Sequence, residues 1–337
     1  MVREVFEVSE PIPLLGCIAF GLIDRGTNLI QVRPITTCPL SCIFCSTDAG
    51  PKSKRRRTEY IVPLDYLIDW FKRVAAFKGE CDIEAHIDTV GDPVTYPRIV
   101  DLVSGLNNVK GVKVISMQTH GSTLTEKILV DLSEAGLTRI NLSIDALGPD
   151  LARKLSGTEW YDPSRIVDLM HYIVSNTKID LLIAPVWIPG INDFEIPKII
   201  ELAKKIGAGK KFPPLGIQKY LIHKHGRKIR GVKPMSWRKF YEQLRRWENE
   251  FGVKLILRPE DFGIHKRPAL PKPYRLFEVI RVKVVGPGWL RGEALAITEK
   301  CDRSITLINA EDIPVGSKVK ARILSSKDNI FVAEPIT

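Results

Sequence analysis

From about residue 28 to residue 258 the chain alternates short runs of apolar, β-branched residues with amphipathic stretches. The first run is NLIQVRP, and the stretch PLDYLIDWFKRVAAFKG spaces its apolar side chains as on one face of a helix. Later strand candidates are CDIEAHIDTVG, VKVISMQTHG, TRINLSID, KIDLLIAPVWIP and PLGIQKYL. Strands that are apolar throughout and separated by helices favour a parallel sheet covered on both faces. About six such units predict a partial (β/α)6 barrel, an α/β fold with its active site at the carboxyl ends of the strands.

A proline-rich stretch, IHKRPALPKPY, separates this segment from a different pattern. Such a composition favours a stiff linker. Five strand candidates divided by turn signals follow it, without long helices, and predict a small all-β barrel. We therefore expect four regions. They are an N-terminal β extension at 1–27, the partial barrel at 28–262, the linker at 263–274 and the small barrel at 275–337.

Three of the six cysteines lie within the eight residues CPLSCIFC, directly after the first strand candidate. Their spacing is Cys38-x-x-x-Cys42-x-x-Cys45. A structural zinc site normally has four ligands, and no second CxxC or paired histidines stand at a suitable distance to complete one. Three thiolates suit a cubane with four irons if one iron is left open to a substrate or cofactor. Burial as small apolar side chains is the remaining alternative.

The pattern CxxxCx(aromatic)C resembles the defining motif of the radical S-adenosylmethionine (SAM) enzymes. Four further segments resemble that family in the expected order, namely TVGDPVTYP, MQTHGSTL, LSID and VWIPGIND. The resemblance implies a [4Fe-4S] cluster on Cys38, Cys42 and Cys45, and SAM as the second cofactor. It also implies reductive cleavage of SAM to methionine and a 5′-deoxyadenosyl radical. The electron would come from a donor such as ferredoxin or flavodoxin.

The same resemblance implies a set of residues that bind SAM. They are Phe44, Gly91, Asp92, Pro93, Thr119, Ser143, Asp145 and Ile188. Gly91-Asp92-Pro93 stands where the family has GGEP, whose backbone receives the methionyl amino group. Val90 replaces the first glycine and Asp92 the glutamate, so the backbone role is the one we expect here. Phe44 is expected to pack over the adenine, with an ordinary core aromatic as the alternative.

The chain has 50 lysines and arginines against 39 acidic residues, so its net charge of +11 favours polyanionic partners. Two basic stretches, KSKRRR and HKHGRKIR, follow the cysteine motif and the sixth β/α unit, where the open face of the barrel is expected. Their candidate RNA contacts are Lys52, Lys54, Arg55, Arg56, Arg57, Lys224, Arg227 and Lys228. A solvated basic loop is the alternative at both places.

The C-terminal strands resemble a TRAM domain, a small barrel that binds RNA in several tRNA-modifying enzymes. The resemblance lies in GEALA, IPVGSKVKARI and FVAEPI. Together with the cysteine motif, this resemblance predicts a radical SAM enzyme that modifies RNA. The favoured substrate is tRNA, and the favoured modification is methylation. Two alternatives remain. One is the same enzyme acting on a protein or a small metabolite, and the other is a non-catalytic RNA-binding protein with a structural metal.

The sequence also predicts a cytoplasmic protein outside the membrane. The N-terminus MVREVFEVSE is charged where a signal peptide is apolar, and no run of eighteen uncharged apolar residues occurs. Clustered cysteines, rather than evenly distributed ones, suit a reducing compartment.

Overall fold

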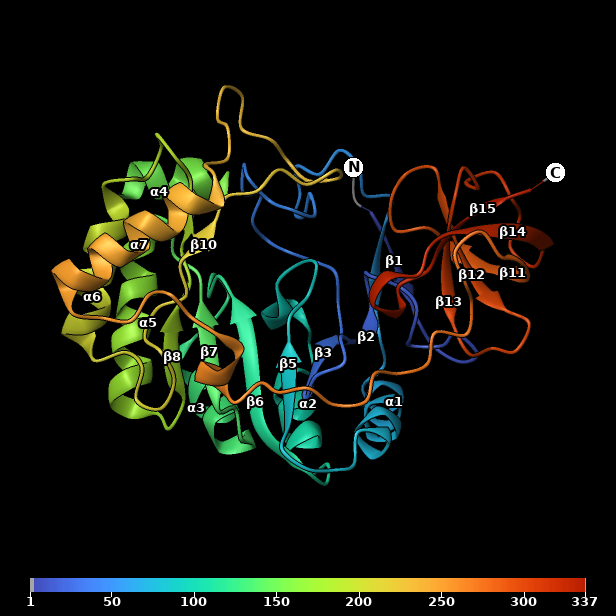
Figure 1. Cartoon of the computed structure of the whole chain (residues 1–337), viewed down its shortest axis with the longest axis horizontal. Coiled ribbons are helices and arrows are strands. Elements are labelled where there is room, and N and C mark those ends of the chain that lie inside the picture. The colour runs from blue at the N-terminus through green and yellow to red at the C-terminus, as the bar shows by residue number, and fades with distance from the viewer. Residues whose placement is uncertain (1–2, 337) are drawn as a thin grey trace. The chain divides into compact units, whose positions relative to one another are not determined.

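The computed structural model describes residues 3–336 and divides into two compact units. Unit 1 is made of the chain up to residue 37, residues 54–113 and the chain from residue 266 onward. Unit 2 is made of residues 38–53 and 114–265. Figure 1 shows the chain coloured by residue number. The cysteine motif therefore belongs to unit 2, and the Gly-Asp-Pro segment belongs to unit 1.

Unit 1 contains the first strands and helices of the α/β part. Its elements there are β1 (Glu4–Glu7), β2 (Gly21–Asp24), β3 (Leu29–Arg33), β4 (Thr58–Ile61), α1 (Leu64–Phe77), β5 (Ile83–Ile87), the 3-10 turn η1 (Pro93–Thr95) and α2 (Ile99–Asn107). β3 is antiparallel to β2 and parallel to β5, while β1 and β4 form a separate parallel pair. α1 buries Leu67, Phe71 and Val74 along one face, which confirms the helix predicted from their spacing.

The C-terminal part of unit 1 is a closed five-stranded barrel. Its elements are β11 (Val279–Pro287), β12 (Glu293–Thr298), β13 (Ser304–Ile308), β14 (Lys318–Ser325), the 3-10 turn η3 (Lys327–Asn329) and β15 (Val332–Pro335). The order around the barrel is β11-β12-β13-β15-β14, and β14 pairs back with β11. Alternate residues such as Ile280, Val282 and Val284 fill the core. The predicted small all-β barrel is confirmed.

Unit 2 carries the remaining β/α units. Its strands are β6 (Val112–Thr119), β7 (Arg139–Leu142), β8 (Asp180–Ile183), β9 (Val186–Trp187) and β10 (Gln218–Lys219). Its helices are α3 (Glu126–Ala135), α4 (Pro149–Ser156), α5 (Pro163–Asn176), α6 (Glu195–Ile206), α7 (Trp237–Phe251) and the 3-10 turn η2 (Pro259–Phe262). β6, β7 and β8 are parallel neighbours, as expected for strands joined by helical crossovers.

Two strands of unit 2 are shorter than the sequence predicts. The run KIDLLIAPVWIP is divided into β8 and β9, because Pro185 between them has no backbone N–H to donate to a ladder. The run PLGIQKYL forms a strand only at β10, which pairs with β9. The ends of β6, β7 and β9 nevertheless carry the polar segments predicted to bind SAM. None of the helices in the described part of the chain combines the length and apolarity that a membrane span requires.

Candidate active site

The loop at residues 38–53, which we call the cluster loop, is held against the C-terminal end of α4. The backbone N–H of Ser41 donates to the carbonyl oxygen of Ser156 at 2.9 Å, and the N–H of Ile43 donates to that of Leu155 at 2.9 Å. The last carbonyl groups of a helix have no partner within the helix. The cluster loop therefore uses acceptors that the end of α4 leaves available.

The three cysteines of the cluster loop differ in exposure. Cys42 is buried, Cys38 and Cys45 are half-buried, and none of the three is in a disulfide. Burial, reinforced by the neighbouring Cys38 and Cys45 thiols, raises the pKa of Cys42 well above its ordinary value. Iron bound to the Cys42 sulfur would remove this penalty, because a bound cation stabilises the thiolate form.

The sulfurs are not arranged around one metal ion. Among the described residues, no three His, Cys, Asp or Glu side chains form a group that fits a single ion. In a four-iron cubane each cysteine binds a different iron, so the sulfurs surround a body larger than one ion. The Sγ of Cys45 accepts a hydrogen bond from the N–H of Ala49 at 3.2 Å, and such bonds support thiolate ligands. Three thiolates without a fourth protein ligand fit a four-iron cluster that leaves one iron open.

Arg227, predicted as an RNA contact, is instead bound to the cluster loop. Its Nη1 donates to the carbonyl oxygen of Cys42 at 2.8 Å, and its Nη2 donates to that of Ala49. Its Nε forms an ion pair of 2.8 Å with Asp48. The backbone N–H of Arg227 donates to the carbonyl oxygen of Cys45 at 2.8 Å. All these donors are used within unit 2, so we assign this side chain to the shape of the cluster loop.

Asp145, after β7, lies in the surroundings of Cys42. Burial raises the pKa of the Asp145 carboxyl, and the nearby His120 opposes that rise. Asp145 Oδ1 accepts from the N–H of Val186 at 2.8 Å. His120 Nε2 is 4.0 Å from the Sγ of Cys42. The buried Asp145 carboxylate and the His120 imidazole thus lie in the surroundings of Cys42, after the neighbouring strands β7 and β6.

Asn192 was not identified from the sequence as a site residue. It is fully buried, and its Nδ2 donates to the carbonyl oxygens of Asp145 at 2.8 Å and Val186 at 2.9 Å. Its Oδ1 accepts from the N–H of Ile188 at 2.7 Å. It therefore joins the segment after β7 to the segment after β9. The motif VWIPGIND contained this residue, but nothing in the sequence showed that its partners are backbone groups.

The other predicted SAM residues of unit 2 lie at strand ends or in the cluster loop. Ser143 Oγ accepts from Gln118 Nε2 at 2.7 Å, and the N–H of Ser143 donates to the carbonyl oxygen of Thr119 at 2.8 Å. Phe44 is 9% exposed and Ile188 is fully buried. Both side chains belong to the interior of unit 2, and their contact with adenine stays a prediction.

The Gly-Asp-Pro segment in unit 1 is held tightly against the chain before the cluster loop. A Cβ atom on Gly91 would lie 2.1 Å from the carbonyl oxygen of Thr37 and 2.2 Å from that of Thr36. Only glycine permits this approach. The N–H of Asp92 donates to Thr37 O at 2.8 Å, and Asp92 Oδ1 accepts from the N–H of Val94 at 3.1 Å as the cap of η1. The Asp92 carboxylate is thus used as the cap of η1. The geometry therefore favours the role in which the backbone of this segment, and not the carboxylate, binds the methionyl amino group of SAM.

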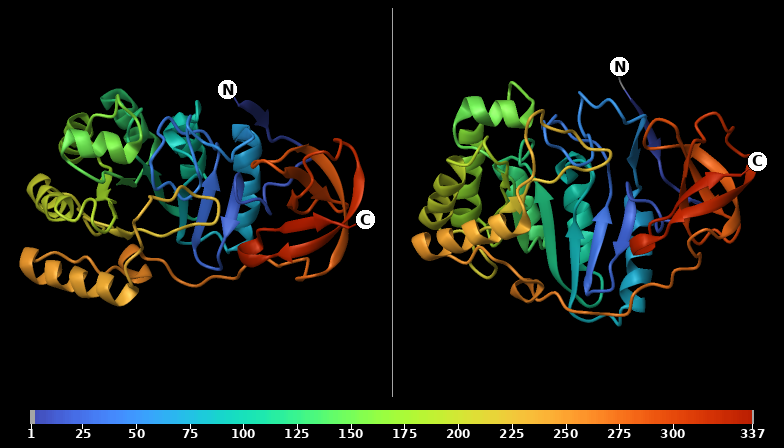
Figure 2. Two further views of the ribbon diagram at one scale, coloured as in Figure 1. Left: turned by 90° about the horizontal axis from the view of Figure 1, so that it is seen from above. Right: turned by 45° about the horizontal axis from the view of Figure 1, so that its top comes forward.

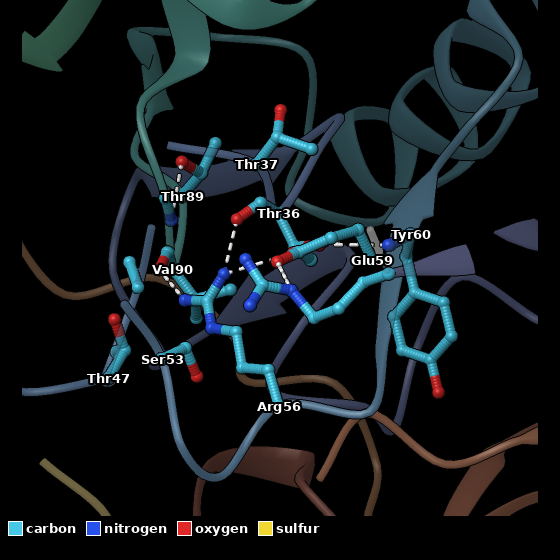
Figure 3. A network of polar contacts seen from close by, with 12 residues as sticks. Thr36, Thr37, Thr47, Ser53, Arg56, Glu59, Tyr60, Thr89 and Val90 are labelled. Atoms are coloured by element: carbon cyan, nitrogen blue, oxygen red, sulfur yellow. Dashed lines mark hydrogen bonds and ion pairs between the residues drawn. The ribbon is translucent and has the colours of Figure 1, made fainter. Parts of the chain in front are cut away.

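Arg56 is 2% exposed although it lies in the basic run KSKRRR. In Figure 3 its guanidinium points to Thr36, Glu59 and Val90, and it is 3.0 Å from Glu59 Oε2. Its Cζ lies 4.9 Å from the centre of the Trp289 ring. Arg56 thus fixes the carbonyl groups that precede the cluster loop and the Gly-Asp-Pro segment. We leave it out of the proposed RNA surface, since it has no exposed face.

The remaining basic candidates are on the surface. In unit 2, Lys52 is exposed and its Nζ donates to the carbonyl oxygen of Gly157 at 2.6 Å, and Lys224 and Lys228 are exposed. The exposed candidates in unit 1 are Lys54 and Arg55, and the half-buried Arg57 forms an ion pair of 3.4 Å with Glu311.

The cysteines outside the motif stand alone. Burial raises the pKa of Cys17 to about 11, which makes it an inert apolar side chain at neutral pH. Cys81 and Cys301 are exposed.

These features define an α/β enzyme with an iron-sulfur cluster on a three-cysteine loop. The family model described as the Radical SAM superfamily matches residues 32–203, half of the chain. The chain belongs to the radical SAM superfamily, and its cofactors are a [4Fe-4S] cluster and SAM. Cys38, Cys42 and Cys45 would hold the cluster, which when reduced supplies the electron for SAM cleavage.

Two curated relatives illustrate the range of similarity. The uncharacterized protein MJ0103 of Methanocaldococcus jannaschii is 46% identical over 352 residues, covering 98% of this chain and 81% of that protein. The probable GTP 3′,8-cyclase of Methanothermobacter thermautotrophicus is 30% identical over 190 residues, covering 55% of this chain and 57% of that protein. The chain thus spans little more than half the length of the cyclase.

Two solved structures are also similar. Streptococcus suis SuiB bound to its precursor peptide SuiA has a TM-score of 0.49 at 15% identity, covering 67% of this chain and 47% of that one. TYW1 with a bound lysine-pyruvate adduct has a TM-score of 0.48 at 18% identity, covering 73% and 80%.

Proposed function

We propose that the protein is a radical SAM enzyme that modifies RNA, with tRNA as the favoured substrate and ferredoxin or flavodoxin as the electron donor. The observation that carries this proposal is the charge next to the cluster loop. Residues 219–246 contain ten lysines and arginines and one acidic residue, and Arg227 in their middle is bonded to the cluster loop. A polyanion is the partner that such a segment attracts.

Further support comes from exposed cations near the cysteine motif in the sequence. Lys52 belongs to the cluster loop itself, and Lys54 and Arg55 follow it in unit 1. The C-terminal barrel, whose sequence resembles a TRAM domain, is proposed as a second RNA contact. The division into a partial barrel at 28–262 and a TRAM-like barrel at 275–337 is likewise part of this proposal.

A free purine nucleotide is the second candidate substrate. One observation favours it, namely the 30% identity to a protein named as a probable GTP 3′,8-cyclase. A nucleotide within RNA and a free nucleotide offer the same purine to a deoxyadenosyl radical. The two candidates differ in the polyanionic chain, which the basic segment would bind only in RNA.

An anaerobic turnover assay separates these candidates. The reconstituted protein is incubated with dithionite and SAM, and 5′-deoxyadenosine is measured with total tRNA, with GTP and with neither. Stimulation by tRNA and not by GTP is the expected result. Stimulation by GTP alone would favour a free purine nucleotide as the substrate instead of RNA. Equal yields of 5′-deoxyadenosine in all three reactions would overturn both candidate substrates.

A further inference from the structure

Two exposed aromatic side chains lie next to each other at the start of α7. The ring centroids of Trp237 and Tyr241 are 5.8 Å apart, and the ring planes differ by 23°. Trp237 is 52% exposed and Tyr241 is 39% exposed. Side chains of this size usually bury most of their apolar surface. Both rings pack edge-on against the buried Phe240, with ring centroids 5.9 Å and 5.5 Å from it, but their exposed parts leave apolar area in solvent.

α7 is anchored mainly by other side chains. Its buried face carries Phe240 and Trp247, whose rings lie 5.8 Å and 4.8 Å from the ring of Trp187 on β9. Its N-terminus is capped by Ser236 Oγ, which accepts from the N–H of Lys239 at 3.3 Å. Figure 2 shows α7 at the outer edge of unit 2. The exposed part of the pair is thus available for a partner, and removing either ring leaves the contacts of Phe240 and Trp247 with Trp187 in place.

Cations are frequent in the chain on either side of the aromatic pair. Lys219 Nζ lies 4.7 Å from the centre of the Trp237 ring. The exposed cations of residues 219–246 are Lys224, Lys228, Arg230, Lys233, Arg238, Lys239, Arg245 and Arg246. The one acidic residue, Glu242, forms an ion pair with Arg238 at 3.5 Å. Lysine is depleted in protein interfaces, whereas cations with interleaved aromatics are typical of surfaces that bind single-stranded nucleic acid.

The same segment leads from the aromatic pair to the cluster loop. Residues 221–236, drawn in yellow to orange in Figure 1, connect β10 to α7. A Cβ atom on Gly226 would lie 2.7 Å from the carbonyl oxygen of Cys45, so only glycine fits here. The next residue is Arg227, which is bonded to Cys42 and Asp48. The segment is thus fixed at the cluster motif through Gly226 and Arg227, and ten residues further along the chain it reaches Trp237.

We propose that Trp237 and Tyr241 form a stacking platform for an unpaired base of the RNA substrate, with the cations of residues 221–236 following the RNA backbone toward the cluster loop. This inference rests on the proposed function. Lys219 leaves the Trp237 ring when a base stacks there and pairs with the adjacent phosphate. The exchange replaces a cation-π contact with base stacking and an ion pair.

The test measures binding of a fluorescein-labelled single-stranded RNA of twelve nucleotides to the full-length protein by fluorescence anisotropy. Trp237→Ala and Tyr241→Ala are each expected to raise Kd roughly 5- to 150-fold, because base stacking on an aromatic ring contributes about 1–3 kcal/mol per base. Trp237→Phe, which keeps a ring, should retain most of the affinity. The matched control is Trp160→Ala, since Trp160 is 59% exposed in unit 2 but lies between Glu159 and Asp162. This control should leave Kd unchanged.

Different results separate the two proposals. If the unaltered protein binds neither this RNA nor total tRNA, the proposed function fails together with the platform. If it binds RNA and both alanine variants bind equally well, the platform alone is overturned. Displacement of the RNA by polyglutamate at equal charge would identify a general site for acidic chains and would also overturn the platform. If Trp237→Ala loses its helical circular dichroism, Tyr241→Ala decides the question.

Discussion

Arg227 Nη1 donates to the carbonyl oxygen of Cys42 at 2.8 Å, and the same guanidinium forms an ion pair with Asp48, further along the cluster loop. Asp48 in turn accepts from Ser53 Oγ at 3.0 Å. A planar guanidinium has several donors in fixed directions, so it holds several acceptors at set positions. The path of the cluster loop is therefore fixed by a residue from a distant part of the sequence.

Replacing Arg227 with alanine should loosen the cluster loop. The change leaves the buried Asp48 carboxylate without its cation, a loss of about 3 kcal/mol for a buried pair. Hydrogen exchange of the amides from Cys42 to Ala49 should become roughly 100-fold faster, as that free energy predicts. Lys228→Ala, which changes the exposed neighbour, is the matched control. Unchanged exchange in Arg227→Ala would contradict the role of this side chain.

Cys42→Ala should abolish the cluster and leave the C-terminal barrel folded. Cys42 would supply one of the three thiolate ligands, whereas the barrel core consists of residues from 280 to 333. Iron and sulfide analysis after anaerobic reconstitution checks the first part, and β-type circular dichroism checks the second. Cys81→Ala, at an exposed cysteine outside the motif, should retain its iron. Full iron content in Cys42→Ala would disprove the ligand assignment.

Replacing the neighbouring residues Arg56 and Arg55 should change two different properties, namely the free energy of unfolding and the affinity for RNA. Arg56→Ala leaves Glu59 and two carbonyl groups short of a buried donor and should cost about 3–5 kcal/mol of unfolding free energy. Arg55→Ala removes an exposed cation, so thermal stability should hardly change while RNA affinity falls and becomes less dependent on salt. Thermal unfolding and anisotropy titrations at two salt concentrations measure both effects. Equal stability of the two variants would show that the buried network is not needed for folding.

Glu293 gives a pH-dependent prediction for unit 1. Burial raises the pKa of this carboxyl, although its Oε2 accepts from the N–H of Leu290 at 3.0 Å. The folded state therefore binds the proton more tightly than the unfolded state, and the ionised form costs stability above the folded pKa. Glu293→Gln should raise Tm at pH 8. The gain should shrink as the pH falls toward 4.5, the ordinary glutamate value, and a constant gain at all pH values would exclude this cause.

Residue periodicity predicted the long, regular elements of the fold. β3 and α1 follow their predicted stretches, because each buries side chains that repeat at the spacing of its own secondary structure. No stretch of the sequence predicted α4, α5 or α7. In α7 only Phe240, Leu244 and Trp247 are buried, and the cations between them conceal the apolar face.

The cysteines of the site could be predicted because they are close together in one loop. The roles of Arg56 and Arg227 could not, since most of their acceptors are backbone carbonyls from distant segments. In the run KSKRRR nothing in the residue types distinguishes the buried Arg56 from the exposed Arg55. Only the position of each side chain relative to Thr36 and Val90 separates a structural arginine from a surface one.

The closed C-terminal barrel limits how this part of the chain meets a partner. Within residues 279–335 every strand has a neighbour on both sides, since β14 pairs with β11 and with β15. An open sheet edge lets a peptide bind by adding a strand, and a closed barrel has no such edge. A partner of this barrel would therefore have to be recognised by the side chains and loops of its outer surface, where single substitutions can change affinity without disturbing the ladder.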